Sequence, residues 1–305
     1  MRPLVLILLT ALLPAACSGL KSSADADVIV VGAGIAGLSA ALEAADQGAS
    51  VMVVEINSVG GGHAVKAGGF ALVDTTLQRK KGIKDSPDLA WADLLRWGED
   101  PDPYWSRRYA EESGTEVYDW LTELGVNFRL VLDTPEDTVP RFHFTRGTAV
   151  HAVVPMMREA LSRPNIRFSW NTRVTDLIIN NNRVTGVLTR NERSGIEQSF
   201  RSNSVILSTG GFQNNLDMVR ANWGAGASPE QIYKGAGHFA TGDGYRLAAQ
   251  GGSAFRRMDR QVTFYGGIPN PRDPDGGTGH FAQNPAAVWL DNHGRRFVNE
   301  TADSK

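Results

Sequence analysis

The chain contains 305 residues, of which 21 % are charged and 42 % hydrophobic, and its formal net charge at pH 7 is −2. This composition suits one large globular domain or two ordinary ones, and it excludes a largely disordered chain. The nearly balanced charge gives no reason to expect a nucleic acid as a partner.

The first 20 residues have the pattern of an export signal. Arg2 precedes an apolar run from Leu4 to Leu13, which is too short to span a bilayer and leads into Pro-Ala-Ala-Cys-Ser-Gly. Cys17, the only cysteine, stands where a lipoprotein signal has its acylated residue, although Pro14 departs from that pattern. Three interpretations stay open: a lipid anchor at Cys17, ordinary signal cleavage, and a cytoplasmic start. We expect an exported protein, either periplasmic or anchored to a membrane as a lipoprotein.

A strand–turn–helix–strand unit follows, with the sequence DVIVVGAGIAGLSAALEAADQGASVMVVE. The run Asp27–Val31 is apolar and too short for a helix, so it predicts a buried parallel strand. In the turn that follows, Gly32 allows a tight bend, Gly34 lets the backbone approach a pyrophosphate, and Gly37 permits close helix packing. Ala36 lies in the same turn and belongs to the same predicted site.

The second half of this unit narrows the choice of nucleotide. A helix that starts near Ile35 would place its positive end at the phosphates. Val51–Val54 predicts the second strand, and Glu55 after it is placed to hydrogen-bond a ribose hydroxyl, which argues against NADP. Residues 56–72 form a glycine-rich loop without a helical period, where an NAD dehydrogenase would usually continue with a short helix.

Five motifs then occur in one order along the chain. They are DVIVVGAGIAGLSAALEAADQGASVMVVE (27–55), GGGHAVKAGG (60–69), ILSTGGF (206–212), TGDGYRLAAQGG (241–252) and HGRRFVNE (293–300). With these motifs the chain resembles the FAD-dependent fumarate reductase/succinate dehydrogenase flavoprotein superfamily, which includes soluble fumarate reductases, 3-ketosteroid dehydrogenases and aspartate oxidase. The resemblance implies FAD as the cofactor.

The expected fold is α/β: a Rossmann-type FAD-binding domain over residues 25–262, followed by the start of an α+β cap domain over 263–305. Residues 87–124 predict helices, with an aromatic stripe over 103–124 that we expect in the core. The β-rich runs between 166 and 201 predict an inserted antiparallel meander. Further expectations are a C-terminal helix cap at Gly125, a helix over 149–161, and Arg146 either facing the cofactor or solvated.

The resemblance also implies roles for individual residues. Glycine pairs would pass close to the pyrophosphate and the isoalloxazine, a backbone amide would meet the adenine, and a turn would lie beside the adenosine half. These residues are Gly61, Gly62, Gly68 and Gly69 for the pairs, Val174 for the amide, and Thr209, Gly210 and Gly211 for the turn. His63 stands where the family usually has serine, threonine or asparagine, so it either hydrogen-bonds the flavin or is a surface imidazole. Asp243 opens a helix and either caps it or approaches the cofactor.

The catalytic groups of soluble fumarate reductases are not found at the corresponding positions. Segment 262–267, VTFYGG, lacks the histidine, and segment 279–287, GHFAQNPAA, lacks the glutamate and arginine. Tyr265 is a candidate acid or base because 3-ketosteroid dehydrogenases use tyrosines beside a carbonyl substrate, and packing at the domain junction is its alternative role. His280 is a second candidate proton carrier. No metal cluster or haem-attachment motif is found.

The expected reaction is hydride transfer between FAD and a C–C bond next to a carbonyl or carboxylate of a small-molecule substrate. A 3-ketosteroid-dehydrogenase-like desaturase is an alternative, and an FAD amine oxidase or hydroxylase is a weaker rival. Most of the family's cap and its C-terminal flavin segment are not found, so we expect a truncated piece of a longer flavoprotein or a shortened protein completed by another polypeptide. A cofactor-binding remnant without catalysis is a further rival. An exported flavoprotein would exchange electrons with a quinone pool or a periplasmic cytochrome.

Overall fold

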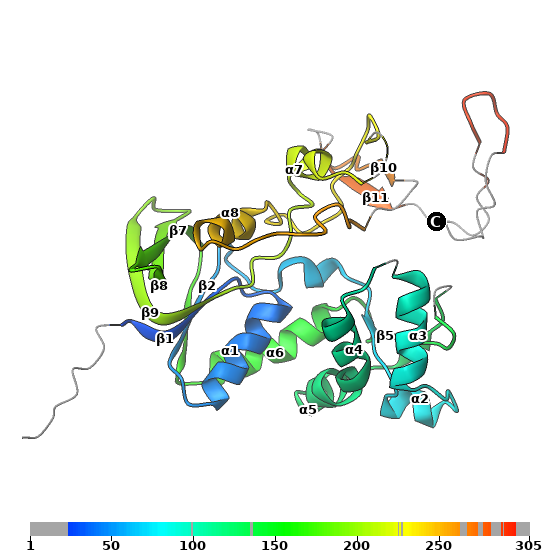
Figure 1. The fold of residues 1–305 in the computed structure, drawn as a ribbon, viewed down its shortest axis with the longest axis horizontal. Helices are drawn as coiled ribbons and strands as arrows, with labels where there is room; N and C mark the ends of the chain where they lie inside the picture. Colours follow the sequence, from blue (N-terminus) through cyan, green and yellow to red (C-terminus); the bar gives the residue numbers. More distant parts are fainter. Residues whose placement is uncertain are drawn as a thin grey trace, which may run out of the picture.

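A six-stranded sheet lies at one side of the molecule, next to α1 (Ile35–Asp46) and α6 (Val150–Ser162) (Figure 1). The computed structural model describes residues 24–98, 100–134, 137–224, 226, 228–262, 267–273, 277–281, 288 and 290–296. The sheet order is β6 (Ile166–Ser169), β2 (Val51–Val54), β1 (Ala26–Val31), β9 (Glu197–Leu207), β8 (Arg183–Asn191) and β7 (Thr172–Asn180). β6, β2, β1 and β9 are parallel, whereas β9, β8 and β7 form an antiparallel meander. The predicted strands and the inserted meander are therefore confirmed.

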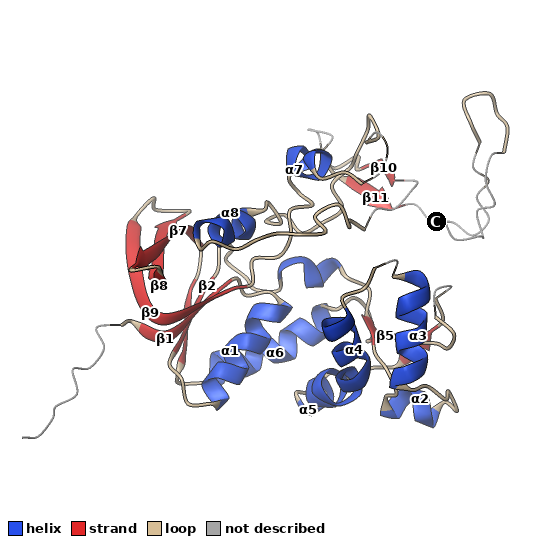
Figure 2. Cartoon of the chain, viewed as in Figure 1, coloured by secondary structure: helices blue, strands red, loops and turns tan. Residues whose placement is uncertain are grey.

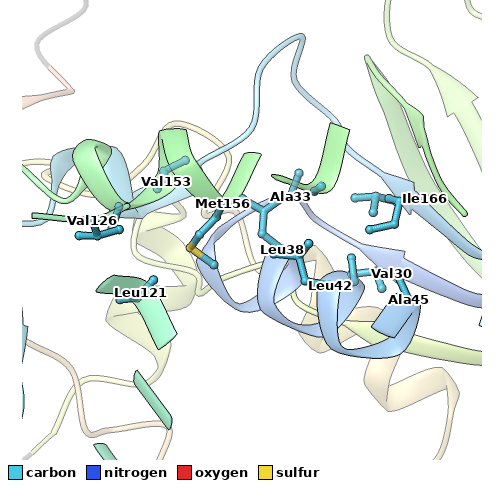
Figure 3. Packing of buried hydrophobic residues seen from close by; sticks show 14 of the residues in the cluster. Val30, Ala33, Leu38, Leu42, Ala45, Leu121, Val126, Val153, Met156 and Ile166 are labelled. Atoms are coloured by element: carbon cyan, nitrogen blue, oxygen red, sulfur yellow. The ribbon is translucent and has the colours of Figure 1, made fainter. Parts of the chain in front are cut away.

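The two faces of the parallel strands are buried against different partners. Successive side chains of a strand point to opposite faces, so Val51 and Val53 pack into one core while Met52 and Val54 pack into another. The first core lies against α1 and α6, as Figure 3 shows. The second includes residues of the meander and of α8 (Asp243–Gln250). Burial on both faces explains why these strands are almost wholly apolar.

The segment between β2 and α6 forms a mainly helical insertion (Figure 2). The 3₁₀ helix η1 (Gly62–Lys66) follows β2, and the insertion starts after it. Its elements are β3 (Phe70–Ala71), α2 (Thr76–Lys80), α3 (Pro87–Trp97), α4 (Pro103–Glu112), the π-helix η2 (Ser113–Asp119), α5 (Trp120–Glu123), β4 (Leu130–Leu132) and β5 (Phe142–Phe144). Ser86 and Asp102 cap α3 and α4, and a proline follows each cap at the first helical position. The predicted helices are confirmed, and Gly125 follows α5 with a φ of +94° as a C-terminal cap.

The aromatic stripe of this insertion is only partly buried, so its prediction as core is wrong for α4. The exposed fractions of Tyr104 and Trp105 are 62 % and 63 %, whereas Tyr118 and Leu121 are buried. A π-helix has more residues per turn than an α-helix. Because η2 separates the two groups, the three-and-four spacing of the stripe is not continued on one face.

A buried polar network holds the insertion together. The Arg141 guanidinium, 3 % exposed, forms ion pairs of 2.8, 2.6 and 3.0 Å with Asp85, Asp93 and Asp137. Next to it, the His143 ring is completely buried, with Nδ1 2.6 Å from the carbonyl of Arg141 and Nε2 2.7 Å from the hydroxyl of Thr75. Burial lowers the pKa of His143. A carbonyl can only accept, so Nδ1 carries the proton and Nε2 accepts from Thr75.

The remaining described elements are α7 (Leu216–Ala221), β10 (Gly267–Pro269) and β11 (Gly279–Phe281). β10 and β11 pair with each other, and Lys234 forms an isolated bridge with Thr278. The division into an FAD-binding domain and a cap beginning at residue 263 stays a prediction. No helix within the described ranges is long and apolar enough to cross a membrane.

Candidate functional site

The glycine motif that joins β1 to α1 has two glycines that pack closely, Gly32 and Gly37, and one that faces open space, Gly34. A Cβ on Gly37 would lie 1.9 Å from the carbonyl oxygen of Gly32, so the helix can approach the turn only without a side chain there. Gly32 has a φ of +104°, and a Cβ on it would lie 2.5 Å from the Ser208 carbonyl. A Cβ on Gly34 would meet no atom within 4 Å. Gly34 is therefore the position where the turn is open to a ligand.

The same open space lies at the N-terminus of α1. Gly34 is the N-cap residue, and no side chain caps the helix. The first N–H groups of a helix have no intrahelical acceptor, and together with the helix dipole they attract an anion. No acid stands in the first turn of α1, which would otherwise compete for this place. These features fit the pyrophosphate of a dinucleotide.

Glu55 ties this turn to the end of β2. Its side chain is 7 % exposed, and its carboxylate accepts hydrogen bonds from the backbone N–H of Ala33 at 2.6 Å and of Asn57 at 2.9 Å. Burial raises the pKa of the Glu55 carboxyl, and the two N–H groups oppose that shift. Each carboxylate oxygen has two lone pairs, so a ribose hydroxyl can still donate to it. The contact with Ala33 was not predicted, because no side-chain pattern signals a backbone donor.

A second glycine loop approaches the turn from a distant part of the sequence. The Gly61 N–H donates to the Ala33 carbonyl at 2.7 Å, and Gly61 forms an isolated parallel bridge with Gly34. A Cβ on Gly62 would lie 3.5 Å from the Gly34 Cα. The expected absence of helical structure in this loop is wrong for residues 62–66, which form η1. Its length of five residues is too short to leave a periodic signal.

Two side chains of η1 hold the loop against the segment before α8. The Gly237 N–H donates to His63 Nδ1 at 2.9 Å, and Lys66 Nζ donates to the Ala236 carbonyl at 2.9 Å. Because Nδ1 of His63 accepts, the ring proton of the neutral imidazole is on Nε2, which remains available as a donor. His63 is exposed. We call these two contacts the loop clamp.

The turn after β9 lies against the start of α8. The Gly242 N–H donates to the Gly211 carbonyl at 3.1 Å, and a Cβ on Gly244 would lie 1.9 Å from the Thr209 hydroxyl oxygen. Gly210 has a φ of +76° and open space around its Cβ position. The structure thus brings together the predicted residues of both TGG and TGDG motifs, at the same end of the parallel strands as the β1 turn.

The expected role of Asp243 as the cap of a helix is not found. Asp243 is the first residue of α8, after the N-cap residue Gly242, and no side chain caps this helix. The Asp243 carboxylate instead forms an ion pair with Arg173, which also lies 3.3 Å from Glu192. A carboxylate in the first turn still interacts favourably with the helix dipole. Arg173 was missed because its contact with Asp243 spans distant parts of the sequence.

The other predicted residues lie outside this cluster or outside the described residues. A Cβ on Gly68 would lie 3.2 Å from the Phe144 ring, and one on Gly69 would lie 2.2 Å from the His143 carbonyl. Packing against β5 is therefore enough to require glycine at position 69, whether or not a cofactor binds there. Val174 is buried in β7, and Arg146 is exposed.

The candidate proton carriers are not placed by the structure. Tyr265 lies outside the described residues, and of His280 only the backbone is described, in β11. In the described part of the chain no group of three or more His, Cys, Asp or Glu side chains could hold a metal ion.

The open glycine turn, the uncapped helix terminus and the acid at the end of β2 define a Rossmann-type dinucleotide-binding protein. Residues 27–305 match the family described as FAD binding domain, and the chain belongs to that family. Its cofactor is accordingly FAD, as the sequence predicts.

The curated relatives are dehydrogenases and reductases. A KsdD-like steroid dehydrogenase of Mycobacterium tuberculosis is 33 % identical over 308 residues, covering 89 % of this chain and 54 % of the relative. A fumarate reductase (cytochrome) of Shewanella frigidimarina is 32 % identical over 289 residues, covering 90 % of this chain and 48 % of the relative. The chain thus spans about half the length of these relatives.

Solved structures show the same fold. The open conformation of a flavocytochrome c3 fumarate reductase gives a TM-score of 0.77 at 24 % identity, covering 91 % of this chain and 49 % of that chain. A 3-ketosteroid-Δ4-(5α)-dehydrogenase from Rhodococcus jostii gives 0.67 at 26 % identity, covering 80 % and 57 %.

Proposed function

We propose that the chain is the FAD-binding part of an oxidoreductase that transfers hydride between FAD and a C–C bond next to a carbonyl or carboxylate. The observation that carries this proposal is the open space at Gly34, at an uncapped helix N-terminus, within a chain of the FAD binding domain family. Curated relatives named as steroid dehydrogenase and fumarate reductase support the reaction class.

The residues of this chain would hold and orient the cofactor. The N-terminus of α1 and the backbone of Gly34 would bind the pyrophosphate, and Glu55 would accept from the ribose while it fixes the turn. Gly61 and Gly62 would leave room for the cofactor to pass, and His63 Nε2 would face the flavin as a donor. When bound, FAD supplies the hydride acceptor or donor of the reaction.

We assign the second half of the FAD site by the same reasoning. The turn with Thr209, Gly210 and Gly211 would lie beside the adenosine half, with a backbone amide near Val174 at the adenine. The ion pair with Arg173 supports a structural role for Asp243, which holds α8 and β7 together beside that turn. Gly68 and Gly69 would approach the isoalloxazine, although packing against β5 also requires glycine at Gly69.

Two substrate classes are candidates: a dicarboxylate such as fumarate, and a ketone similar to a 3-ketosteroid. The 33 % identity to a KsdD-like steroid dehydrogenase favours the ketone, as does the absence of fumarate-reductase catalytic residues at the expected sequence positions. Tyr265 or His280 would then move the proton. A cofactor-binding protein without catalysis is the competing proposal.

Anaerobic mixing of the FAD-loaded chain with each substrate class tests these proposals. Loss of the oxidised-flavin absorption with a saturated 3-ketosteroid, but not with succinate, supports the ketone. A reduced flavin that is reoxidised by fumarate supports the dicarboxylate. Flavin that reacts with neither class, in a chain that retains FAD, supports the binding protein and contradicts the proposed reaction.

We further propose that the protein is exported and anchored through Cys17, with a quinone or a cytochrome as electron partner. The apolar run followed by the single cysteine supports this location. Mass spectrometry of the mature protein from the native membrane fraction tests it. A diacylglyceryl modification at Cys17 is expected, and an intact unprocessed N-terminus in the soluble fraction would contradict the proposal.

A further inference from the structure

A polar cavity lies at the end of β1 opposite to the glycine turn. Its volume is about 270 Å³, and its lining comes from the chain before β1 and from β7, β8 and β9. Figure 1 shows these three strands side by side. The lining residues are Ala24, Asn180, Arg183, Thr185, Arg201, Ser202 and Asn203. Because Ala26 pairs with Ser202 at the start of β1, this cavity is separate from the proposed FAD site at the carboxyl end of that strand.

The cavity is positively charged and contains no acid in its lining. Arg183 and Arg201 are both exposed. The ion pairs of the described residues involve other arginines, for example Arg141, Arg163 and Arg173, and Arg183 and Arg201 are not among them. Two arginines therefore line one cavity, and neither has a carboxylate partner in the described part of the chain.

Two acids that contact lining residues, Asp25 and Asp27, are held by neutral groups. The Asp25 carboxylate accepts from the Arg201 backbone N–H at 2.8 Å, and the Asp27 carboxylate accepts from the backbone and hydroxyl of Ser50 at 2.9 and 2.6 Å. Asn203 Nδ2 donates to Asp27 at 3.4 Å. These contacts direct both carboxylates to backbone and neutral donors, so neither carboxylate forms an ion pair with Arg183 or Arg201.

The rest of the lining consists of neutral hydrogen-bonding groups. Asn180 Nδ2 donates to the Thr185 hydroxyl at 2.8 Å, and one guanidinium nitrogen of Arg183 donates to the Asn203 carbonyl at 3.3 Å. Ser202 is 5 % exposed, and its hydroxyl donates to the Ser204 carbonyl at 2.9 Å. An arginine guanidinium has five N–H donors, and its planar fork matches the oxygens of a phosphate. We propose that this cavity binds a phosphate group.

Two sources would present the same chemistry: a phospholipid headgroup and a soluble phosphate. The position of the cavity makes the headgroup accessible if the proposed anchor at Cys17 is present. Ala24 is seven residues after Cys17, and an extended chain of that length reaches at most about 25 Å. An anchored protein would therefore hold this cavity near the membrane surface, where anionic headgroups attract arginine.

The test compares two double variants of the full chain. R183Q/R201Q removes both guanidinium groups of the cavity. R190Q/R193Q is the matched control, because it removes the same charge from exposed positions at the other end of β8, where Arg190 lies roughly 20 Å from Arg183 along the strand. Calorimetric titration with inorganic phosphate and co-sedimentation with phosphatidylglycerol or phosphatidylcholine vesicles are the two probes. Circular dichroism checks the fold of each variant.

We expect the cavity variant to bind at least about tenfold more weakly than the control variant, since charge-assisted bonds to phosphate are lost. A loss with inorganic phosphate supports a soluble phosphate as the ligand. A loss with phosphatidylglycerol vesicles, without measurable binding of inorganic phosphate, supports a lipid headgroup. Equal behaviour of the two variants with both probes overturns the proposal, and neither probe depends on FAD or on catalysis.

Discussion

Gly34 and Gly37 lie three residues apart, the first at the N-cap of α1 and the second within its first turn, yet their surroundings differ completely. A Cβ at position 37 would lie 1.9 Å from the Gly32 carbonyl oxygen, whereas one at position 34 would meet nothing within 4 Å. Gly34 also has an ordinary φ of −75°. Packing therefore explains the glycine at 37, whereas the open space at 34 leaves room for a ligand.

This difference gives opposite expectations for two alanine variants. Gly37→Ala should lower the free energy of unfolding by about 1–3 kcal/mol, because the added methyl forces the helix away from the turn. Gly34→Ala should lower that free energy by less than about 1 kcal/mol but weaken FAD binding at least tenfold, because its Cβ enters the cofactor space. Urea unfolding and FAD titration measure the two effects. Wild-type FAD affinity in Gly34→Ala would contradict the assignment of the pyrophosphate site.

His143 gives a pH dependence of stability. Burial holds the pKa of His143 below its ordinary value of 6.5. The proton that makes the imidazole cationic is therefore bound more tightly by the unfolded chain than by the folded protein. Its contribution to stability should be complete above pH 6.5 and should be lost as the pH falls towards the folded pKa. The slope is at most about 1.4 kcal/mol per pH unit.

Urea unfolding of the wild type and His143→Gln between about pH 5 and pH 8 measures this contribution. The difference in unfolding free energy between the two proteins should shrink at the acid end. His238→Gln is the control, because that side chain is exposed. A difference that is constant over the whole range would show that His143 does not titrate as expected.

At the scale of elements, the loop clamp connects η1 to the segment before α8. Lys66 and His63 each make one 2.9 Å bond across this junction. Lys66→Met should loosen the loop, with faster hydrogen exchange over residues 60–69 and FAD binding about tenfold weaker. Lys80→Met, at an exposed position of α2, is the control. Unchanged exchange over residues 60–69 in Lys66→Met would contradict a holding role for this side chain.

The elements that follow local rules could be predicted from the sequence. β1, β2 and α1 are specified by apolar runs and a glycine turn, and the meander by β-rich runs separated by Asn and Gly. The same holds for the candidate site where it depends on glycines. The tight bend at Gly32 and the close packing at Gly37 agree with their spacing, whereas the cofactor contact of Gly34 stays a prediction.

Features that depend on long-range contacts could not be predicted. The π-helix η2 has more residues per turn than an α-helix. The aromatic residues before and after it therefore do not lie on one face, although their spacing in the sequence predicts that they do. The pairing of Arg173 with Asp243 and the loop clamp join residues far apart in the sequence. Such contacts leave no periodic signal, because the fold alone brings the partners together.

For the whole molecule, the central claim is that the separate glycine segments form one cofactor site. The turn at Gly34 and the loop at Gly61 are joined by a backbone bridge, and Glu55 fixes the same turn from β2. The turn at Gly211 lies against α8 at the same end of the sheet. A site formed from such distant segments should stabilise the fold when its ligand binds.

The most direct measurement is the visible absorption spectrum of the 305-residue chain after incubation with FAD and gel filtration, with Gly34→Ala in parallel. We predict that flavin absorption elutes with the wild-type protein and is lost from the folded Gly34→Ala variant. A folded wild-type protein that elutes without flavin would contradict the account. Equal retention of flavin by both proteins would place the cofactor elsewhere.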